Sequence, residues 1–435
     1  MEADSPAIEP SGAWQRLKGM LSGHPRSVWT LMLAVVVLWI GRGMVIPFTV
    51  IFFTQIVGLK GSIVGGGIAG ASLIGIAAVT ITAGLIDRFG GKPVLVASIL
   101  TMGVANMLLA WAESVLPYLL ATLVFYVASQ SYWPSIDSLT STLARQDRVI
   151  QTFSMVRVAN AIGIGVGGFL GGLMVSGGQL MEYRVMYMVG GVLFLAGAGV
   201  IWGLVPAGTA PKASEDEVGA DAGWKYVLND RTFLYSMVLL FVLVLGFTQV
   251  NMSVPPFLRG EAGASEGFIG AMFFLNTLLV ITLQVPLAAR VDRGNAGKLL
   301  SLAALAWAGA FAFMILTVNS VYLAIGVFAL FTAGELLFMP LSAVFAVRLA
   351  PVNLRGRYFS MLSMTWGGSS AIATLAAGWI QDADDPIIMW PVMIFIMLAA
   401  AVGALRLRGS RRLRYQPPEP ARSASPVAVP AGGSE

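Results

Sequence analysis

The chain has 435 residues, of which 57% are hydrophobic and only 11% are charged, and its net charge at pH 7 is +5. The charged share is about half that of a soluble protein, so lipid must surround most of the apolar residues. Cysteine is absent, and His24, the single histidine, precedes the first apolar run. These counts exclude thiolate metal sites, cysteine nucleophiles and a histidine relay inside the membrane. The sequence also has no separate polar domain that would bind nucleic acid.

Apolar runs long enough to cross a bilayer, which takes about 20 helical residues, recur twelve times along the chain. We therefore predict an all-α membrane protein with twelve transmembrane helices. The first run lacks a cleavage site and carries Arg42, which favours a retained span over a signal peptide. In chain order the expected spans are 28–55, 63–86, 93–112, 117–142, 151–175, 185–205, 232–256, 267–289, 298–317, 321–347, 358–380 and 387–406.

The polar segments between these runs divide the chain into two pseudo-symmetric six-helix bundles. The expected parts are an N-terminal segment 1–27, a bundle 28–205, a central loop 206–231, a second bundle 232–406 and a tail 407–435. The tail begins with arginines and then becomes rich in Pro, Ala and Ser, which is typical of disorder. Its arginines would anchor the topology and could also bind anionic membrane lipids.

Lysine and arginine are distributed very unequally between the two faces of the predicted membrane domain. Apart from Arg42 and Arg157 within spans, one face carries only Lys60, Arg184 and Arg259, and all the others share the face of the two termini. The positive-inside rule therefore predicts that both termini are cytoplasmic. We expect an integral protein of the plasma (inner) membrane.

A spacing of 206 residues relates equivalent positions in the two bundles. It separates Pro134 from Pro340, Lys92 from Lys298, and the tripeptide Phe-Ser-Met at 153–155 from its copy at 359–361. Several matches in the same order indicate a duplicated six-helix unit. Such a duplication places a binding cavity between two halves that can rock around it, which is the architecture of a transporter.

The loop between the second and third spans reads AGLIDRFGGKPVL over residues 83–95. It resembles the signature G-x-L-a-D-r-x-G-r-k-x-x-l of the major facilitator superfamily, with Ala83 and Gly91 as departures. A degenerate copy, VDRG, follows the eighth span at 291–294. The resemblance implies a conformational gate that holds the outward-facing state by pairing charges across the cytoplasmic helix ends. Its residues would be Asp87, Arg88, Gly90, Lys92, Asp292 and Arg293.

The fifth span carries a second motif, with glycines at 163, 167, 168, 171 and 172. Small residues four apart allow close approach between membrane helices, so the stripe is first a packing face. Gly163, Gly167, Gly168, Gly171 and Gly172 also resemble the antiporter motif g-x-x-x-G-P-x-x-G-G of the twelve-helix drug:proton antiporter branch. Gly168 replaces its proline. The branch's usual arginine in the fourth span is missing, and Tyr126 lies near its place.

Two glycine patterns, 65–70 and 163–168, match the dinucleotide-binding fingerprint by spacing alone. That fingerprint acts at a strand-to-helix turn, whereas both patterns lie inside apolar helices. No phosphate-binding G-x-x-x-x-G-K-[ST] motif occurs either. We therefore expect that ATP is not the energy source. Without cysteine, an intramembrane histidine or a recognisable metal cluster, we expect no enzyme, no cofactor and no metal. The resemblance to the antiporter branch implies a proton gradient as the energy source.

Four charges lie deep in the predicted spans, where each costs roughly 2.5–3.5 kcal/mol to insert. They are Arg42, Asp137, Arg157 and Glu335. Asp137 and Arg157 have similar depth in adjacent spans, so an ion pair between them is plausible, and it could be purely structural. Glu335 lies among aromatic residues, where burial favours the protonated form of a carboxyl group and aromatic faces suit a cation. A structural bond from Glu335 to Arg42 or to the backbone is the alternative.

Further polar and aromatic side chains occur within the spans, and amides facing lipid would lack hydrogen-bond partners. We expect these side chains to line a cavity between helices, although any single one could equally be satisfied by a neighbouring helix. They are Gln130, Trp133, Asn160, Gln249, Asn251, Asn276 and Trp366.

The resemblance implies proton-coupled efflux of lipophilic or cationic drug-like compounds by alternating access. In certain multidrug antiporters of the branch, acidic residues in the fourth and tenth spans handle proton and substrate, and Asp137 and Glu335 are similar in placement. The partners would be a small-molecule substrate, protons and membrane lipids, and we expect a monomer. The alternative is export of an amphipathic or lipid-like anionic metabolite bound by Arg42 or Arg157. A membrane-embedded enzyme and a non-transporting receptor are both disfavoured.

Overall fold

The computed structural model describes residues 23–145, 148–206, 220–293, 295–349 and 354–409. The predicted N-terminal segment, most of the central loop and nearly all of the tail lie outside these ranges. Within them the chain is almost wholly helical and contains no strand. The twelve long helices are α2 (Arg26–Val45), α4 (Gly61–Phe89), α5 (Gly91–Leu109), α6 (Val115–Leu143), α7 (Val149–Met174), α8 (Leu180–Leu204), α10 (Arg231–Met252), α12 (Glu266–Arg293), α13 (Ala296–Leu316), α14 (Ala324–Leu349), α15 (Arg355–Gln381) and α16 (Met389–Leu405).

Short helical segments extend or connect these long helices. Pro47 interrupts the first span, which continues through η1 (Ile46–Phe48), α3 (Thr49–Ile51) and η2 (Phe52–Ile56). The remaining segments are α9 (Ala220–Asn229), α11 (Val254–Gly260), η4 (Val321–Leu323), η6 (Pro386–Ile388) and η7 (Arg406–Gly409).

Within the described ranges, eleven helices are long and apolar enough to cross a membrane. The remaining long helix, α15, has 27 residues but is rich in serine, threonine and glycine, so its hydropathy is lower. The twelve-helix prediction is thus supported by helix length throughout and by hydropathy in every helix but one. This more polar helix packs on α4 of the first half, as the contacts below describe.

Local chemistry sets several helix boundaries. Gly90 separates α4 from α5 with a φ of 85°, a left-handed conformation that residues with a side chain rarely adopt. The Asp230 carboxylate accepts a hydrogen bond from the backbone N–H of Phe233 (3.1 Å) and caps α10. Asn295 does the same for Lys298 (3.1 Å) at the start of α13. Each cap satisfies a backbone donor that the first helical turn leaves unpaired.

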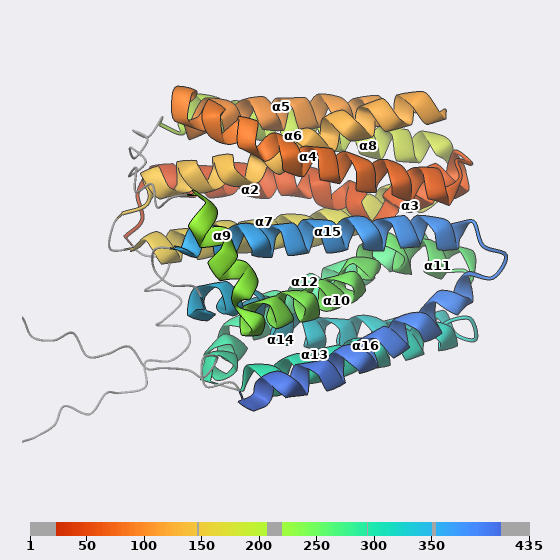
Figure 1. The fold of residues 1–435 in the computed structure, drawn as a ribbon. Coiled ribbons are helices and arrows are strands. Elements are labelled where there is room, and N and C mark those ends of the chain that lie inside the picture. Colours follow the sequence, from red (N-terminus) through yellow and green to blue (C-terminus); the bar gives the residue numbers. More distant parts are fainter. Residues whose placement is uncertain (1–22, 146–147, 207–219, 294, 350–353, 410–435) are drawn as a thin grey trace, which may run out of the picture.

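Helix partners repeat between the two halves, as the internal duplication predicts. In the first half α2 packs on α7, α4 on α6, and α5 on both α6 and α8. In the second half the equivalent pairs are α10 with α15, α12 with α14, and α13 with both α14 and α16. Figure 1 shows the two halves as neighbouring groups of helices, and α15 packs between α10 of its own half and α4 of the other half.

The two halves contact each other through α4 with α15 and α7 with α12, and we call these contacts the seam. Gly65 lies against Gly378, where an added Cβ would be 2.9 Å from the opposite Cα. Gly172 lies against Gly270 in the same way, at 3.0 Å. All four glycines are in the parts of their helices nearer to α3 and α11, an end that we call the closed end (Figure 1). The opposite end, where α8 stops and α10 begins, is the linker end.

The glycine stripe of α7 has two faces with different partners. Gly171 faces α2, where a Cβ would lie 2.5 Å from the carbonyl oxygen of Met44. Gly172 faces α12, where a Cβ would lie 2.5 Å from the carbonyl oxygen of Glu266. One face therefore holds α7 inside its own half, and the other forms part of the seam.

These adjacent glycines form a matched pair for mutation. We expect Gly171→Val to lower the free energy of unfolding by about 1–3 kcal/mol, because it overpacks the interior of one half. Gly172→Val should change stability less and instead push the two halves apart at the closed end. Thermal unfolding of the purified protein, followed by intrinsic fluorescence, separates the two effects. Equal losses of stability in both variants would contradict the two-faced packing.

Candidate functional site

The first half carries a loose ion pair in an aromatic setting. Arg157 Nη2 on α7 lies 3.5 Å from Asp137 Oδ1 on α6, and the two side chains are 53% and 40% exposed. The guanidinium centre of Arg157 lies 4.6 Å from the ring centroid of Trp133. The ring of Trp133 in turn lies 5.5 Å from that of Trp39 on α2, whose indole N–H donates to the Tyr132 hydroxyl (2.9 Å). A long and exposed pair of this kind contributes little stability, so both groups remain available.

Arg42 lies deeper in the same half and is held by aromatic rings. Its guanidinium centre lies 4.4 Å from the ring centroid of Phe125 and 5.7 Å from that of Tyr126, both on α6. Among the described residues it has no carboxylate in ion-pair contact. The fourth span lacks an arginine of its own near Tyr126, and the first span supplies a guanidinium beside that residue.

Glu335 is the deep carboxylate of the second half, and its partner is an amide. The side-chain amide nitrogen of Asn276 on α12 donates to Glu335 Oε2 (2.9 Å) and to the hydroxyl of Thr332 (2.8 Å), both on α14. Glu335 is half-buried, and the structure does not pair it with Arg42. The alternative of a structural Glu335–Arg42 bond is therefore absent in this conformation.

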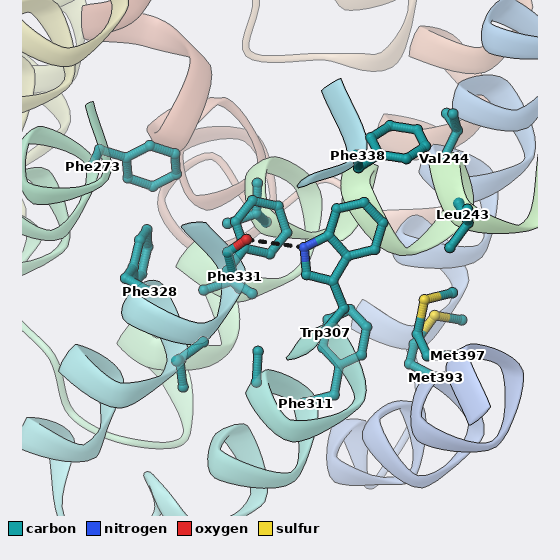
Figure 2. Close-up of a cluster of buried hydrophobic side chains, with 14 of the residues drawn as sticks. Leu243, Val244, Phe273, Trp307, Phe311, Phe328, Phe331, Phe338, Met393 and Met397 are labelled. Atoms are coloured by element: carbon teal, nitrogen blue, oxygen red, sulfur yellow. Dashed lines mark hydrogen bonds between the residues drawn. The ribbon is translucent and has the colours of Figure 1, made fainter. Parts of the chain in front are cut away.

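An aromatic cluster surrounds the helical turns on either side of Glu335. Trp307 on α13 donates its indole N–H to the carbonyl oxygen of Phe331 (3.0 Å), and the two rings stack at 5.7 Å (Figure 2). Phe338, one turn after Glu335, lies 5.7 Å from the half-buried ring of Trp366 on α15. The Trp307 indole also packs against Gly334, where a side chain would collide with it. The aromatic rings thus fix the segment of α14 that presents the carboxylate.

The other predicted cavity residues have varied surroundings. Gln249 is fully buried, accepts a hydrogen bond from Ser253 (2.7 Å) and donates to the carbonyl oxygen of Ala373 (3.4 Å), so it ties α10 to α15. Asn160 is 6% exposed, and neither atom of its amide has a hydrogen-bond partner among the described residues. Gln130 and Asn251 are half-buried.

The predicted gate residues whose side chains the structure describes do not join the two halves. Asp87 and Arg88 are exposed at the linker end of α4. Lys92 donates to the carbonyl oxygen of Trp202 (2.8 Å) on α8, which belongs to its own half. The side chains of Asp292 and Arg293 lie outside the described part of the structure. Cross-half pairing by this loop therefore remains a prediction for another conformation.

The closed end instead contains a network that the sequence analysis did not identify. Glu266, at the start of α12, is 4% exposed, and its Oε1 accepts from Arg259 Nε (2.7 Å) and from the Tyr183 hydroxyl (2.9 Å). Arg259 Nη1 also donates to Gln55 Oε1 (2.9 Å), and Gln55 donates to the carbonyl oxygen of Pro256 (2.9 Å). Because Gln55 and Tyr183 belong to the first half, these bonds cross between the halves.

Asp382 forms a second cross-half contact at the closed end. Its carboxylate accepts from the backbone N–H groups of Gly61 (2.5 Å) and Ser62 (2.8 Å), at the N-terminus of α4. Burial raises the pKa of Asp382, but the hydrogen bonds from Ser62 and Gly61 and the charge of Lys60 outweigh it and hold the pKa below its ordinary value. A helix N-terminus carries partial positive charge, so the ionised carboxylate is the form that stabilises this contact. We call Asp382 and the Glu266 network together the latch.

Comparison with known proteins gives consistent results. The family model described as Major Facilitator Superfamily matches residues 31–374 and, in an overlapping second match, 237–431. The curated relative "Multidrug resistance protein MdtH" of Escherichia coli O9:H4 (strain HS) is 26% identical over 345 residues, covering 75% of this chain and 81% of the relative. The protein of the same name from Shigella sonnei (strain Ss046) gives the same identity and coverage.

Solved structures of two transporters share the fold. The nucleoside transporter NupG aligns with a TM-score of 0.64 at 13% identity, covering 89% of this chain and 100% of that chain. A peptide transporter POT in complex with sulfate aligns with a TM-score of 0.67 at 18% identity, covering 89% and 94%. At these identities the likeness extends to the fold alone.

The latch predicts a specific pH dependence. Because the pKa of Asp382 is lowered when the closed end is shut, its contribution is complete above the ordinary aspartate pKa of about 3.9 and is lost as the pH falls through the lowered value. We therefore expect this contribution to be constant between about pH 5 and pH 8. The closed end can be shut or open, and we expect Asp382→Asn to shift the equilibrium between these two conformations toward the open one. The expected shift is about two- to fivefold, the usual effect of a charge at a helix end.

Spin labels on cysteines introduced by Ser114→Cys and Asn319→Cys would report the distance between the halves at the closed end, since the chain has no cysteine of its own. Asp384→Asn, an exposed aspartate two residues away, is the matched control and should leave the distance unchanged. An unchanged distance in Asp382→Asn would contradict the role of this carboxylate.

Proposed function

Because this chain belongs to the major facilitator superfamily, we propose that it exports lipophilic, cationic drug-like compounds in exchange for protons. Family membership makes it a membrane transporter and not an enzyme. The observation that carries the finer proposal is Glu335, a deep carboxylate with aromatic neighbours and no cationic partner within ion-pair distance among the described residues. The name of the curated relative, a multidrug resistance protein, supports the same substrate class.

The chemistry around Glu335 suits an amphipathic cation. A carboxylate supplies charge neutralisation, and the half-buried ring of Trp366 supplies a face that attracts a cation when water is excluded. Asn276 leaves one carboxylate oxygen of Glu335 without a hydrogen bond from the described residues. That oxygen is available to a proton or to a substrate cation. Aromatic surfaces tolerate varied shapes, which fits a transporter of broad specificity.

Competition between a proton and a substrate cation for Glu335 would couple the two movements. Either one neutralises a charge that is costly to keep in a low-dielectric interior, and so permits the halves to rock. Asp137 is a second carboxylate that could carry a proton, since Arg157 compensates it only loosely. The transmembrane proton gradient would then supply the energy, without a further cofactor.

Orientation follows from the distribution of basic residues. By the positive-inside rule the linker end is cytoplasmic, with both termini on that side of the plasma (inner) membrane. With this orientation the closed end faces outward, and the contacts between the halves described above shut the outer side of the transporter. We propose that a monomer performs the whole cycle, because each half contributes its own deep charges.

Export of an amphipathic anion is the second candidate, and Arg42 favours it. Its guanidinium is held against the rings of Phe125 and Tyr126 and lacks a carboxylate partner among the described residues. A cation held in this way would suit the headgroup of a lipid-like metabolite. The two candidates differ in the sign of the substrate charge, and therefore in which deep residue is essential.

The first test addresses Glu335. We expect Glu335→Gln to reduce proton-driven uptake of tetraphenylphosphonium into inside-out proteoliposomes at least tenfold, because the neutral amide cannot exchange a proton for a cation. Glu261→Gln, which neutralises an exposed glutamate near the closed end, should retain the activity of the wild type. Wild-type coupling in Glu335→Gln would refute the assignment.

The second test addresses Arg42 with a panel of anionic and cationic amphiphiles. If the substrate is a cation, Arg42→Gln should leave its KM within about threefold and mainly alter the rate, since the guanidinium does not touch a positive group. If the substrate is an anion, the same change should raise its KM at least tenfold, the loss of one charge-assisted contact. Transport of anions alone by the wild type would replace the first proposal with the second.

A further inference from the structure

Helix α12 contacts both the deep carboxylate and the seam. On one side, the two hydrogens of the Asn276 amide are taken by Thr332 and Glu335, so α12 is tied to α14 at the level of the carboxylate. The Thr332 hydroxyl donates to the carbonyl oxygen of Phe328 (2.6 Å), which fixes its position. Asn276 therefore has no freedom to turn away while Glu335 stays in place.

On another side, the same helix forms the seam with α7. Glu266, Gly270, Phe273 and Thr277 follow one another at helical spacings of three and four residues, so they lie along one stripe. Gly270 lies against Gly172, Phe273 against Gly168 and Thr277 against Gly165. The seam thus extends from the latch at Glu266 to Thr277, the residue directly after Asn276.

The contact at Thr277 is too close for independent movement. A Cβ at Gly165 would collide with the Thr277 side chain, so this part of α12 lies directly on the backbone of α7. Packed interfaces respond to small displacements by changing between discrete arrangements, because they cannot deform continuously. A shift of α12 at Asn276 would therefore also move Thr277 and change its packing on α7.

We propose that Asn276 is a positioning residue that transmits the occupancy of Glu335 to the α7–α12 seam. This inference rests on the proposed function, in which Glu335 binds a proton or a cation. While Glu335 is ionised and empty, its bond to Asn276 keeps α12 in the position relative to α14 in which the α12 stripe fits the glycines of α7, and the closed end stays shut. When a proton or a cation takes the carboxylate charge, the bond to Asn276 weakens and α12 is released from the seam. The neutralised site then faces outward.

The test separates binding from the conformational response. Spin labels at the Ser114→Cys and Asn319→Cys positions report opening of the closed end, and equilibrium binding of tetraphenylphosphonium reports the site itself. In the wild-type background we expect the probe, or a change from pH 8 to pH 5.5, to raise the open-to-closed ratio at least fivefold, a typical coupling between sites. In Asn276→Ala we expect binding within about tenfold of the wild type but a change in the ratio of less than about twofold.

Two further variants support the comparison. Asn276→Ser removes the amide with a smaller loss of polarity and should behave as Asn276→Ala does, provided that both elute as monodisperse protein. Thr282→Val, on the same helix, removes a hydroxyl that bonds only to carbonyl groups of α12 and should respond as the wild type does. A wild-type response in the Asn276 variants would overturn the proposal. Loss of probe binding in them would overturn it too, since Asn276 would then be a ligand contact.

The response to the change from pH 8 to pH 5.5 tests the role of Asn276 separately from the proposal of a cationic substrate. If the wild type opens on acidification but neither binds tetraphenylphosphonium nor responds to it, the cationic substrate is wrong and Asn276 is still tested by the pH response. If the probe binds and opens the closed end equally well in wild type and Asn276→Ala, the substrate proposal stands and the role of Asn276 is refuted.

Discussion

The close approach of α7 to two helices at once is the constraint on which the rest of the structure depends. Lipid provides no hydrophobic driving force between helices, so association relies on close van der Waals contact. The glycines of α7 provide such contact with α2 on one face and α12 on the other. The first contact is internal to one half, whereas the second must break and reform if the halves rock. The placement of glycine thus determines both the stability of a bundle and the position of its moving boundary.

The deep charges are divided unequally between the two halves. Asp137 compensates Arg157 in the first half, which leaves Arg42 among aromatic rings as a cation without an acidic partner in the described structure. The second half presents Glu335, held by an amide that carries no charge. The insertion cost of such groups is substantial, so a structure that keeps them implies a use for them. Each half offers one type of charge, and either a proton or a charged substrate changes the balance between them.

Sequence reasoning performed best where the physical cause is local or periodic. Apolar run length predicted twelve helices, and the 206-residue spacing predicted that the same helix partners recur in both halves. The proximity of Asp137 to Arg157 followed from equal depth in adjacent spans. The latch was missed because it depends on conformation. Nothing in the sequence of the loop after α15 distinguishes Asp382, which caps α4 from the other half, from Asp384 and Asp385 beside it.

The Asn276–Glu335 bond at the candidate site is another contact that the sequence did not predict. Both residues were identified as polar groups inside spans, but their pairing depends on the rotation of α12 relative to α14, which periodicity does not specify. For the loop over residues 83–95, the sequence identified the residues but not their contacts. Its residues were found from the motif, yet Lys92 bonds to the carbonyl oxygen of Trp202 within its own half. A sequence describes every state of a transporter at once, whereas a structure describes one.

The exposed position of Asp382 makes the contact at the closed end sensitive to the surrounding medium. Mobile ions screen charges at the surface over about 8–10 Å at physiological ionic strength, while charges inside the protein are screened much less. The contact between Asp382 and the start of α4 therefore weakens as the salt concentration at the closed end rises, whereas the interactions of the half-buried Glu335 and Arg42 change much less. When the contact opens, the freed N–H groups of Gly61 and Ser62 face the solution, where anions can compete with the carboxylate for them. Salt at the closed end thus acts on the contact between the two halves more strongly than on the charges deep in the helices.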